Sequence, residues 1–319
     1  MKKALITGIS GQDGSYLAEL LLSKGYNVYG TAYKVSTDAM WRIDSIKKDI
    51  TVYKCDVRDE MCITEVVRTV KPDEIYHLAS LVETRVSLEV EKEIFEVNFK
   101  GTQYLLQAIK THAEKSKFFL AGSSLMFGDV ESSPQNEQTP LRPNTPYGIA
   151  KTAGFCLTKM YREVHNIFAC TGILYNHESP RRDIRFLPRK ITATAANIAA
   201  GKERELVLGN IKAERDWGFA GDYVEAMWRM LSAKIPDDYV IGTGKIHSVE
   251  NILEIAFDFF GLDWREHVRV DSSLFRKVDT TLLLADTRKI ERKLKWKPKV
   301  LFKELIIKMV QADAIRVGL

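Results

Sequence analysis

Short apolar runs alternate with longer stretches of helical periodicity over the first half of the chain. This alternation of strand-length and helix-length segments predicts an α/β protein with a doubly wound parallel (Rossmann) sheet and helices on both faces. The expected strands are 3–7, 27–30, 50–53, 74–79, 118–122 and 168–173, and the expected helices are 15–22, 60–69 and 94–112.

The pattern changes after about residue 175, where strand-like runs shorten and arginines become denser. This change predicts a NAD-binding Rossmann domain over residues 1–176 and a smaller C-terminal substrate-binding lobe over 177–319. Parts of 218–243 are expected to return to the first domain. Residues 130–146, rich in Pro, Asn, Ser and Thr, are expected to be irregular.

Composition narrows the function classes. The chain has 319 residues, enough for two such units, and its 45% hydrophobic and 28% charged residues are typical of globular proteins. The net charge of +5 is spread along the chain, so no nucleic-acid partner is expected. No run reaches the roughly 18 apolar residues of a membrane span, so we expect no membrane partner and a cytoplasmic location. The four cysteines show no metal-ligand spacing and are expected to be reduced thiols, with no metal site.

Three glycines follow the first expected strand at the start of the first expected helix, as Gly8, Gly11 and Gly14. In this position glycines allow a tight turn, a close approach of the backbone to a pyrophosphate, and helix–strand packing, while the helix N-terminus faces the anion. Turn glycines without a ligand are the alternative, but the strand–helix junction favours a dinucleotide site.

The second strand indicates which dinucleotide is bound. Its end carries Tyr33-Lys34-Val35-Ser36, with neither an acid for a ribose 2′-hydroxyl nor an arginine pair for a 2′-phosphate. We therefore expect NAD, with NADP less favoured, although Lys34 alone could hold a phosphate. Asp56 is placed to accept from the adenine amino group or, alternatively, to cap a helix. The remaining predicted cofactor contacts are Gln12, Asp13, Val57, Leu78, Tyr147 and Lys151.

Tyr147 and Lys151 lie four residues apart, so on a helix they share one face. An ammonium near a phenol favours the phenolate, which can act as a base. Ser123, after the strand at 118–122, could hydrogen-bond the tyrosine oxygen and a substrate hydroxyl. An exposed pair is the alternative, but together with the glycines these three residues predict a catalytic site.

With these motifs the chain resembles the extended short-chain dehydrogenase/reductases, and within them the GDP-mannose 4,6-dehydratases, over nearly its whole length. The segments that carry the resemblance are 4–18, 146–151, 175–182 (Tyr-Asn-His-Glu-Ser-Pro-Arg-Arg), 189–192, 208–210, 215–228 (Arg-Asp-Trp-Gly onward) and 296–298. The resemblance implies a GDP-sugar substrate and residues that bind it: Asn176, Arg215 and Arg276 for the diphosphate, and Lys190, Gly209 and Asn210 for the guanine side. It also implies a structural role for Asn98. Surface ion pairs are the alternative role for Arg215 and Arg276. We further expect a homodimer or homotetramer.

The chain departs from this family at three places. Leu125 stands where the dehydratases have their catalytic glutamate. Lys34-Val35 replaces their arginine pair, and Ser80-Leu81-Val82-Glu83 replaces an Ala-Gln-Ser pattern beside the sugar. Because leucine cannot exchange a proton, and a positioned acid–base group contributes roughly 10²- to 10⁴-fold, elimination of water should be crippled while C4 oxidation survives.

The sequence therefore predicts an NAD-dependent GDP-sugar 4-dehydrogenase that makes a 4-keto sugar without dehydration. In this it is similar to the GDP-manno-heptose 4-dehydrogenases of capsular-sugar pathways. A 4,6-dehydratase with a relocated base, for which Glu83 is the candidate, and a 4-epimerase remain alternatives. From another class, a non-catalytic nucleotide-sugar or redox sensor is disfavoured because the Tyr147–Lys151 pair is intact.

Overall fold

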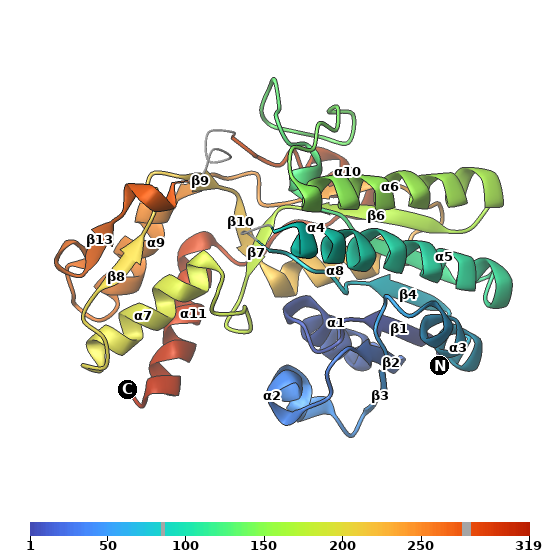
Figure 1. The fold of residues 1–319 in the computed structure, drawn as a ribbon, viewed down its shortest axis with the longest axis horizontal. Helices are drawn as coiled ribbons and strands as arrows, with labels where there is room; N and C mark the ends of the chain where they lie inside the picture. Colours follow the sequence, from blue (N-terminus) through green and yellow to red (C-terminus); the bar gives the residue numbers. More distant parts are fainter. Residues whose placement is uncertain (84–86, 276–281) are drawn as a thin grey trace.

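The computed structural model describes residues 1–83, 87–275 and 282–319. A large body built on one sheet carries a smaller lobe at one side, which contains the C-terminus (Figure 1). The two bodies meet near β7 and β10, so residues from both contribute to the region between them (Figure 1).

The central sheet has seven parallel strands in the order β11-β6-β5-β4-β1-β2-β3. The strands are β1 (Lys3–Thr7), β2 (Asn27–Ala32), β3 (Ile50–Lys54), β4 (Glu74–His77), β5 (Lys117–Ala121), β6 (Ala169–Leu174) and β11 (Tyr239–Ile241). This order reverses direction at β1, and β1 and β4 are neighbours there. In open parallel sheets, ligands bind beyond the carboxyl ends of the strands at such a reversal.

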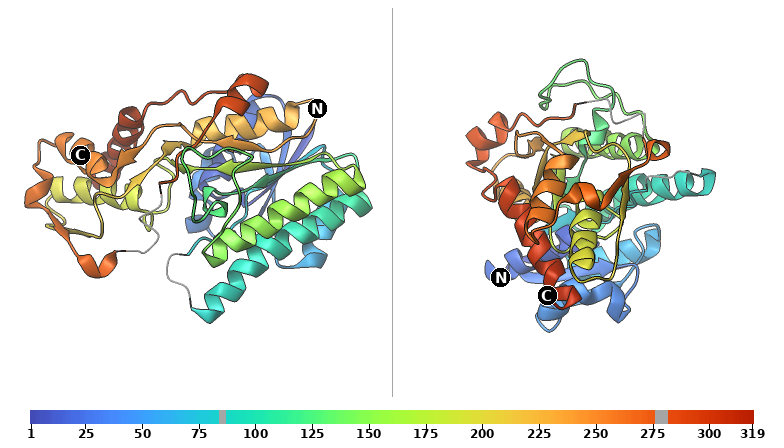
Figure 2. Two further views of the ribbon diagram at one scale, coloured as in Figure 1. Left: turned by 90° about the horizontal axis from the view of Figure 1, so that it is seen from above. Right: turned by 90° about the vertical axis from the view of Figure 1, so that its left-hand side faces the viewer.

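Helices cover both faces of the sheet, as the sequence predicts. One face packs against α1 (Gln12–Ser23) and α8 (Ala220–Ser232), and the other against α3 (Glu60–Val70), α5 (Gly101–His112) and α6 (Pro146–His165). The helices α5 and α6 run side by side in both Figure 1 and Figure 2. The doubly wound α/β prediction is confirmed.

The third predicted helix begins earlier than expected. It starts at Leu88 as α4 (Leu88–Phe95), continues through a π-helical turn, η2 (Glu96–Lys100), and ends with α5. The first turns are mostly exposed and charged, so they carry no apolar periodicity to find. The π turn matters for the site because Asn98 lies in it.

The lobe has its own core, formed by α7 (Leu187–Ala199), α9 (Val249–Asp258) and α11 (Phe302–Val317). Short two-stranded pairs lie beside these helices: β7 (Asn176–Glu178) with β10 (Trp217–Phe219), β9 (Glu214–Arg215) with β12 (His247–Ser248), and β8 (Leu206–Leu208) with β13 (Val268–Val270). The chain returns from the lobe through α8 and β11, and β11 forms an edge of the central sheet. The last short helix of the large body is α10 (Arg288–Leu294).

Two details differ from the sequence expectations. The strand β4 ends at His77 rather than at 79 because the next two amides, of Leu78 and Ala79, donate to the Thr7 hydroxyl of β1 instead of continuing the ladder. The expectation of four reduced thiols is wrong for Cys55 and Cys62, which form a disulfide across the turn from β3 to α3. Among the described residues, no helix is long and apolar enough to cross a bilayer.

Candidate active site

The glycine loop between β1 and α1 packs so closely on neighbouring backbone that two of its positions require glycine. Gly8 has φ +71°, and a Cβ on it would lie 2.9 Å from the Cα of Ala79. A Cβ on Gly14 would lie 2.7 Å from the Cα of Ile9. The N-cap residue of α1 is Gly11, which provides no capping side chain, so the first amides of the helix are open to an anion. Open amides at a helix N-terminus are groups that bind a pyrophosphate.

The adenosine end of such a ligand would lie beyond β2 and β3, whose last residues, Ala32 and Lys54, are paired. Here the carboxylate of Asp56 accepts hydrogen bonds from the backbone amide and from the guanidinium of Arg58. The distance from Nη2 of Arg58 to Oδ2 of Asp56 is 2.7 Å. The guanidinium carbon of Arg58 lies 5.5 Å, and the ammonium of Lys34 5.8 Å, from the centre of the Tyr33 ring. Asp56 is therefore already engaged by a neighbouring cation that the sequence interpretation did not consider.

The other predicted cofactor residues have different surroundings. Val57 is buried in the core between α3 and α5, so only its backbone can face a ligand. Leu78 follows β4 and is partly buried. The side chains of Gln12 and Asp13 turn towards β7, where they meet His177 and Ser179. The roles predicted for these four residues stay predictions.

The sequence pair Tyr147–Lys151 lies on the first turns of α6, which begins at Pro146 and is capped by the Thr145 hydroxyl. The ammonium of Lys151 is 5.6 Å from the centre of the Tyr147 ring. Burial lowers the pKa of Lys151 from 10.5 to about 7, since its side chain is 1% exposed. The tyrosine and lysine therefore share one helix face, as their spacing predicts.

Several groups act on the Tyr147 hydroxyl. Burial raises its pKa, whereas the hydroxyls of Ser80 and Ser123 and the cation Arg182 lower it. Ser123 is the N-cap of a short 3-10 helix, η3 (Ser124–Met126), that follows β5. The structure thus brings the three predicted catalytic residues together at the ends of β5 and α6, and it adds Ser80 from the end of β4.

His77, at the end of β4, is buried near Lys151. Its Nδ1 is 2.7 Å from the Thr7 hydroxyl, and its other ring nitrogen is buried without a hydrogen-bond partner. Burial and the nearby Lys151 ammonium lower its pKa to about 3. The imidazole of His77 is therefore neutral, and it does not add a second positive charge near Lys151.

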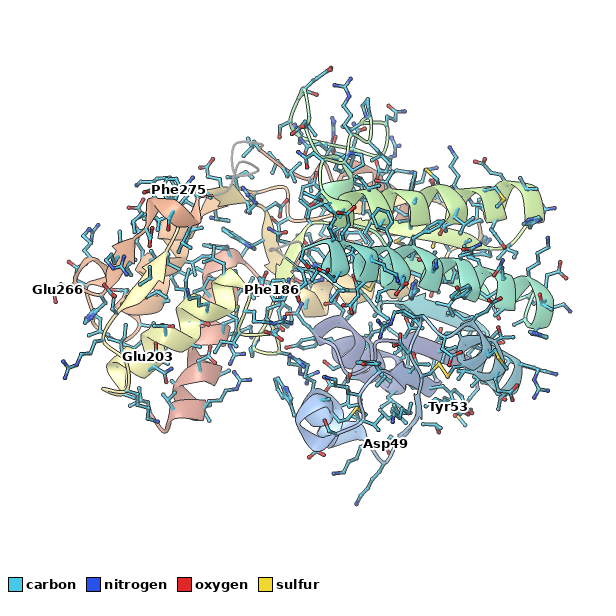
Figure 3. All side chains as sticks on the ribbon, viewed as in Figure 1. Asp49, Tyr53, Phe186, Glu203, Glu266 and Phe275 are labelled. Atoms are coloured by element: carbon cyan, nitrogen blue, oxygen red, sulfur yellow. A yellow bond between two sulfur atoms is a disulfide. The ribbon has the colours of Figure 1, made fainter. Side chains whose placement is uncertain are left out.

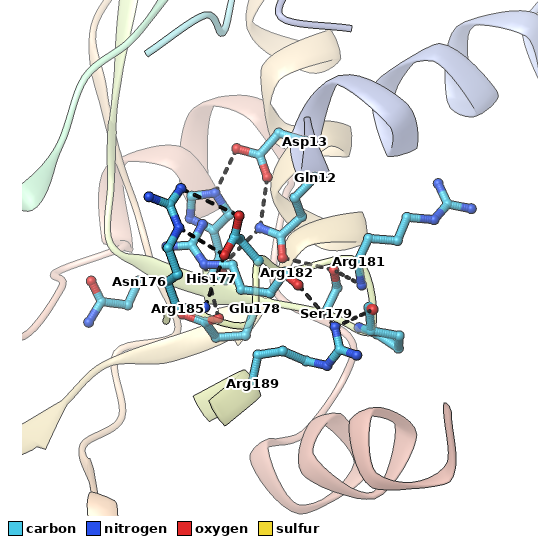
Figure 4. A network of polar contacts seen from close by, with 12 residues as sticks. Gln12, Asp13, Asn176, His177, Glu178, Ser179, Arg181, Arg182, Arg185 and Arg189 are labelled. Carbon is cyan, nitrogen blue, oxygen red and sulfur yellow. Dashed lines mark hydrogen bonds and ion pairs between the residues drawn. The ribbon is translucent and has the colours of Figure 1, made fainter. Parts of the chain in front are cut away.

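A buried polar network links the glycine loop to the lobe (Figure 4). Asp13 accepts from His177 at 2.8 Å, and His177 stacks on Tyr223 with 4.6 Å between ring centres. Burial alone would lower the pKa of His177, but the carboxylate of Asp13 raises it. Glu178 forms an ion pair of 3.2 Å with Arg182. The Asp13–His177 contact holds the start of α1 against β7.

Arg182 also contacts residues that lead into the lobe. Its guanidinium lies 3.6 Å from the ring centre of Phe186, a residue at the junction of the two bodies (Figure 3). The backbone carbonyl of Arg182 accepts from Arg189, which pairs with Asp313 of α11 at 3.0 Å. The turn that carries Arg182 is therefore anchored to the lobe core.

The residues predicted for the sugar nucleotide fall into two groups. Asn176 and Arg215 line one small cavity together with Ser124, Leu125, Tyr175, Asp216 and Leu283. Lys190 lies further into the lobe, where its ammonium donates to the carbonyl of Val207, and Gly209-Asn210 directly follows β8. Arg276 lies outside the described residues.

The same cavity contains the position where the family glutamate is missing. Leu125, in η3, lies two residues after Ser123 and next to Asn176 and Arg215 around the cavity. Among the described residues that line it, the only carboxylate belongs to Asp216, which accepts from the amides of Thr243 and Gly244. The proposed substitute base, Glu83, is 3.0 Å from Arg185 in an ion pair.

Three residues next to the site were missed by the sequence interpretation: Ser80, His177 and Arg182. His177 and Arg182 belong to the Tyr-Asn-His-Glu-Ser-Pro-Arg-Arg segment, so their clustering with other motif residues was the available indication. Ser80 was noticed only as a departure from a family pattern.

Comparisons with known proteins identify the family of this chain. A family model described as GDP-mannose 4,6 dehydratase matches residues 5–309. GDP-mannose 4,6 dehydratase 2 of Arabidopsis thaliana is 43% identical over 98% of this chain and 87% of that protein.

Solved structures show the same fold. The dTDP-glucose 4,6-dehydratase DesIV from Streptomyces venezuelae, with NAD bound, superposes with a TM-score of 0.86 at 24% identity, covering 99% of this chain and 98% of that one. RMD from Pseudomonas aeruginosa, complexed with NADPH, superposes with 0.84 at 19% identity, covering 99% and 100%. These neighbours bind different dinucleotides, so they leave the choice between NAD and NADP open.

Proposed function

The chain belongs to the GDP-mannose 4,6-dehydratase family, and from this premise we propose that it oxidises the C4 hydroxyl of a GDP-linked sugar with a nicotinamide cofactor. The observation that supports this proposal is that the predicted catalytic residues lie near both the glycine loop and the cavity. Ser123 directly precedes Ser124 and Leu125, which line the cavity with Asn176 and Arg215, and the charge of Asp13, at the start of α1, acts on Tyr147.

The glycine loop and the open amides of α1 would hold the dinucleotide by its pyrophosphate. When bound, the nicotinamide would accept a hydride from C4 of the sugar. On this chain's side, the Tyr147 oxygen would take the proton of the C4 hydroxyl, and Ser123 would hold that hydroxyl by a hydrogen bond. Arg182 would favour the tyrosinate by its charge, and the ammonium of Lys151, which lies beside the Tyr147 ring, would add to this effect.

Two reactions are possible after C4 oxidation: loss of water, or release of the ketone. Family membership favours the reaction that goes on to lose water. A dehydratase must remove the C5 proton, and for that step we propose Glu83, on the loop after β4. Its carboxylate would first have to leave Arg185.

One observation supports the second candidate, a 4-dehydrogenase that releases the 4-keto sugar. Leu125 offers no proton-exchanging group beside the cavity, and the carboxylate of Asp216 is occupied by backbone amides. The altered 80–83 loop supports a sugar other than mannose, such as a manno-heptose. We propose NAD as the cofactor of either reaction.

Product mass distinguishes the two reactions. Purified protein would be incubated with NAD and, in turn, GDP-mannose, GDP-manno-heptose and UDP-glucose, with mass spectrometry of the sugar nucleotide and absorbance of the reduced cofactor. Loss of one water without net cofactor reduction supports the dehydratase, and Glu83→Gln should then abolish it. Loss of two hydrogens with one reduced cofactor per product supports the dehydrogenase. Turnover of UDP-glucose alone would overturn the GDP-sugar assignment.

A further inference from the structure

The first turn of α6 packs closely on η3, and the contact between them is made at Gly148. A Cβ built on Gly148 would lie 2.5 Å from the carbonyl oxygen of Leu125. Ordinary contacts of a Cβ begin at 3.4 Å, so a side chain here would have to push the two elements apart by about 0.9 Å. The absence of a side chain at Gly148 therefore permits this close approach.

The surroundings of Gly148 give an added side chain no second direction. The built Cβ would also lie 3.1 Å from the Thr145 hydroxyl and 3.2 Å from the Cβ of Pro143. The same hydroxyl caps the helix, because it accepts the amide of Gly148 at 3.1 Å. Since the direction of a Cβ is fixed by the backbone, it could not turn away from the carbonyl of Leu125.

The short helix η3 is anchored at both of its ends. Before it, the amide of Gly122 donates to the carbonyl of Gly172 in β6 at 2.8 Å. After it, the carbonyl of Phe127 accepts from the amide of Arg142 at 3.2 Å. Because both ends of η3 are held, the first turn of α6 is the part that has to yield to a new side chain. That turn carries Tyr147.

We propose that Gly148 is a positioning residue, and that its contact with η3 sets the separation between the side chains of Ser123 and Tyr147. Ser123 is tied to this contact from one side, because its hydroxyl accepts the amide of Leu125 at 3.2 Å. Tyr147 is tied to it from the other side, as the direct neighbour of Gly148 in α6. The inference rests on the proposed roles of Ser123 and Tyr147 in C4 oxidation, where a misplacement of about 1 Å can cost about 100-fold in rate.

Gly148→Ala tests the inference with one added methyl group. With the GDP-sugar that the wild type turns over, kcat should fall about 100-fold, while KM and the affinity for NAD stay nearly unchanged. Gly154→Ala is the matched control on the same helix and should keep the wild-type kcat, since a Cβ there would lie 3.4 Å from its nearest neighbour, the Leu120 side chain. Thr145→Ala adds no atom but removes the cap of the same turn, so it should also lower kcat, and it replaces Gly148→Ala if that variant does not fold.

Crystal structures of the NAD-bound wild type and of Gly148→Ala give a readout that needs no turnover. The distance between the hydroxyl oxygens of Ser123 and Tyr147 should differ between them by about 0.5–1 Å. The inference is overturned by an unchanged distance, by Gly148→Ala (or Thr145→Ala in its place) retaining more than a tenth of the wild-type kcat, or by an equal loss of kcat in Gly154→Ala. A wild type without turnover but with the expected displacement would count against the proposed function alone.

Discussion

Replacing Lys151 by methionine should make the cofactor-free protein more stable while it abolishes activity. Lys151 is 1% exposed, and burial lowers its pKa from 10.5 to about 7. At 1.36 kcal/mol per pKa unit, this difference corresponds to a penalty of up to ~5 kcal/mol for keeping the ammonium in the folded state. Because relaxation and water penetration reduce such penalties, and methionine keeps most of the packing, we expect a gain of ~2–3 kcal/mol.

The gain should depend on pH in a defined direction. Below about pH 7 the lysine is charged in both states, so the whole penalty is present. Between about 7 and 10.5 the unfolded chain binds more protons than the folded one, so wild-type stability rises with pH and the penalty fades. The advantage of Lys151→Met should therefore be largest near pH 6.5 and should shrink towards alkaline pH.

Urea unfolding followed by circular dichroism, at about pH 6.5 and about pH 9.5, measures both values. Lys159→Met is the matched control, since this lysine lies on the same helix with a side chain 52% exposed and should give no comparable gain. The reasoning is refuted if Lys151→Met is no more stable than the wild type near pH 6.5, or if its gain is the same at both pH values.

Three further outcomes are expected. Tyr147→Phe should lower turnover at least about 100-fold, the minimum for a lost general base, with cofactor and GDP-sugar affinities nearly unchanged by calorimetry; retention of more than about a tenth of the turnover would contradict its role. Arg215→Ala should weaken GDP binding by roughly 1.5–3 kcal/mol without affecting NAD, whereas Arg269→Ala, an exposed arginine paired with Glu205, should leave both intact. Wild-type protein should bind NAD(H) at least as tightly as NADP(H), because Arg58 is already held by Asp56; a tenfold preference for NADP(H) in calorimetry would reverse this assignment.

Local features of this protein could be predicted from the sequence because they depend on near neighbours along the chain. The glycine loop needs only a strand, a turn and a helix start, and the Tyr147–Lys151 pair needs only one helix face. The boundaries of elements were not predicted correctly where the apolar periodicity is missing, as in the exposed first turns of α4. Leu125, which the sequence interpretation assigned to the position of the family glutamate, lines the cavity in the structure.

Only the tertiary structure decided which distant side chains meet around the tyrosine. Asp13 and His177 are 164 residues apart in sequence, and the contact between them exists because α1 and β7 close on each other across the two bodies. Ser80 and Asn98 meet because a π turn directs the asparagine to the end of β4. The sequence by itself determined the fold class, the family and the chemical groups of the site, since strand and helix periodicity and short motifs are local. The surroundings that set the protonation of those groups are contacts between separate elements, and these come from packing, which no local pattern records.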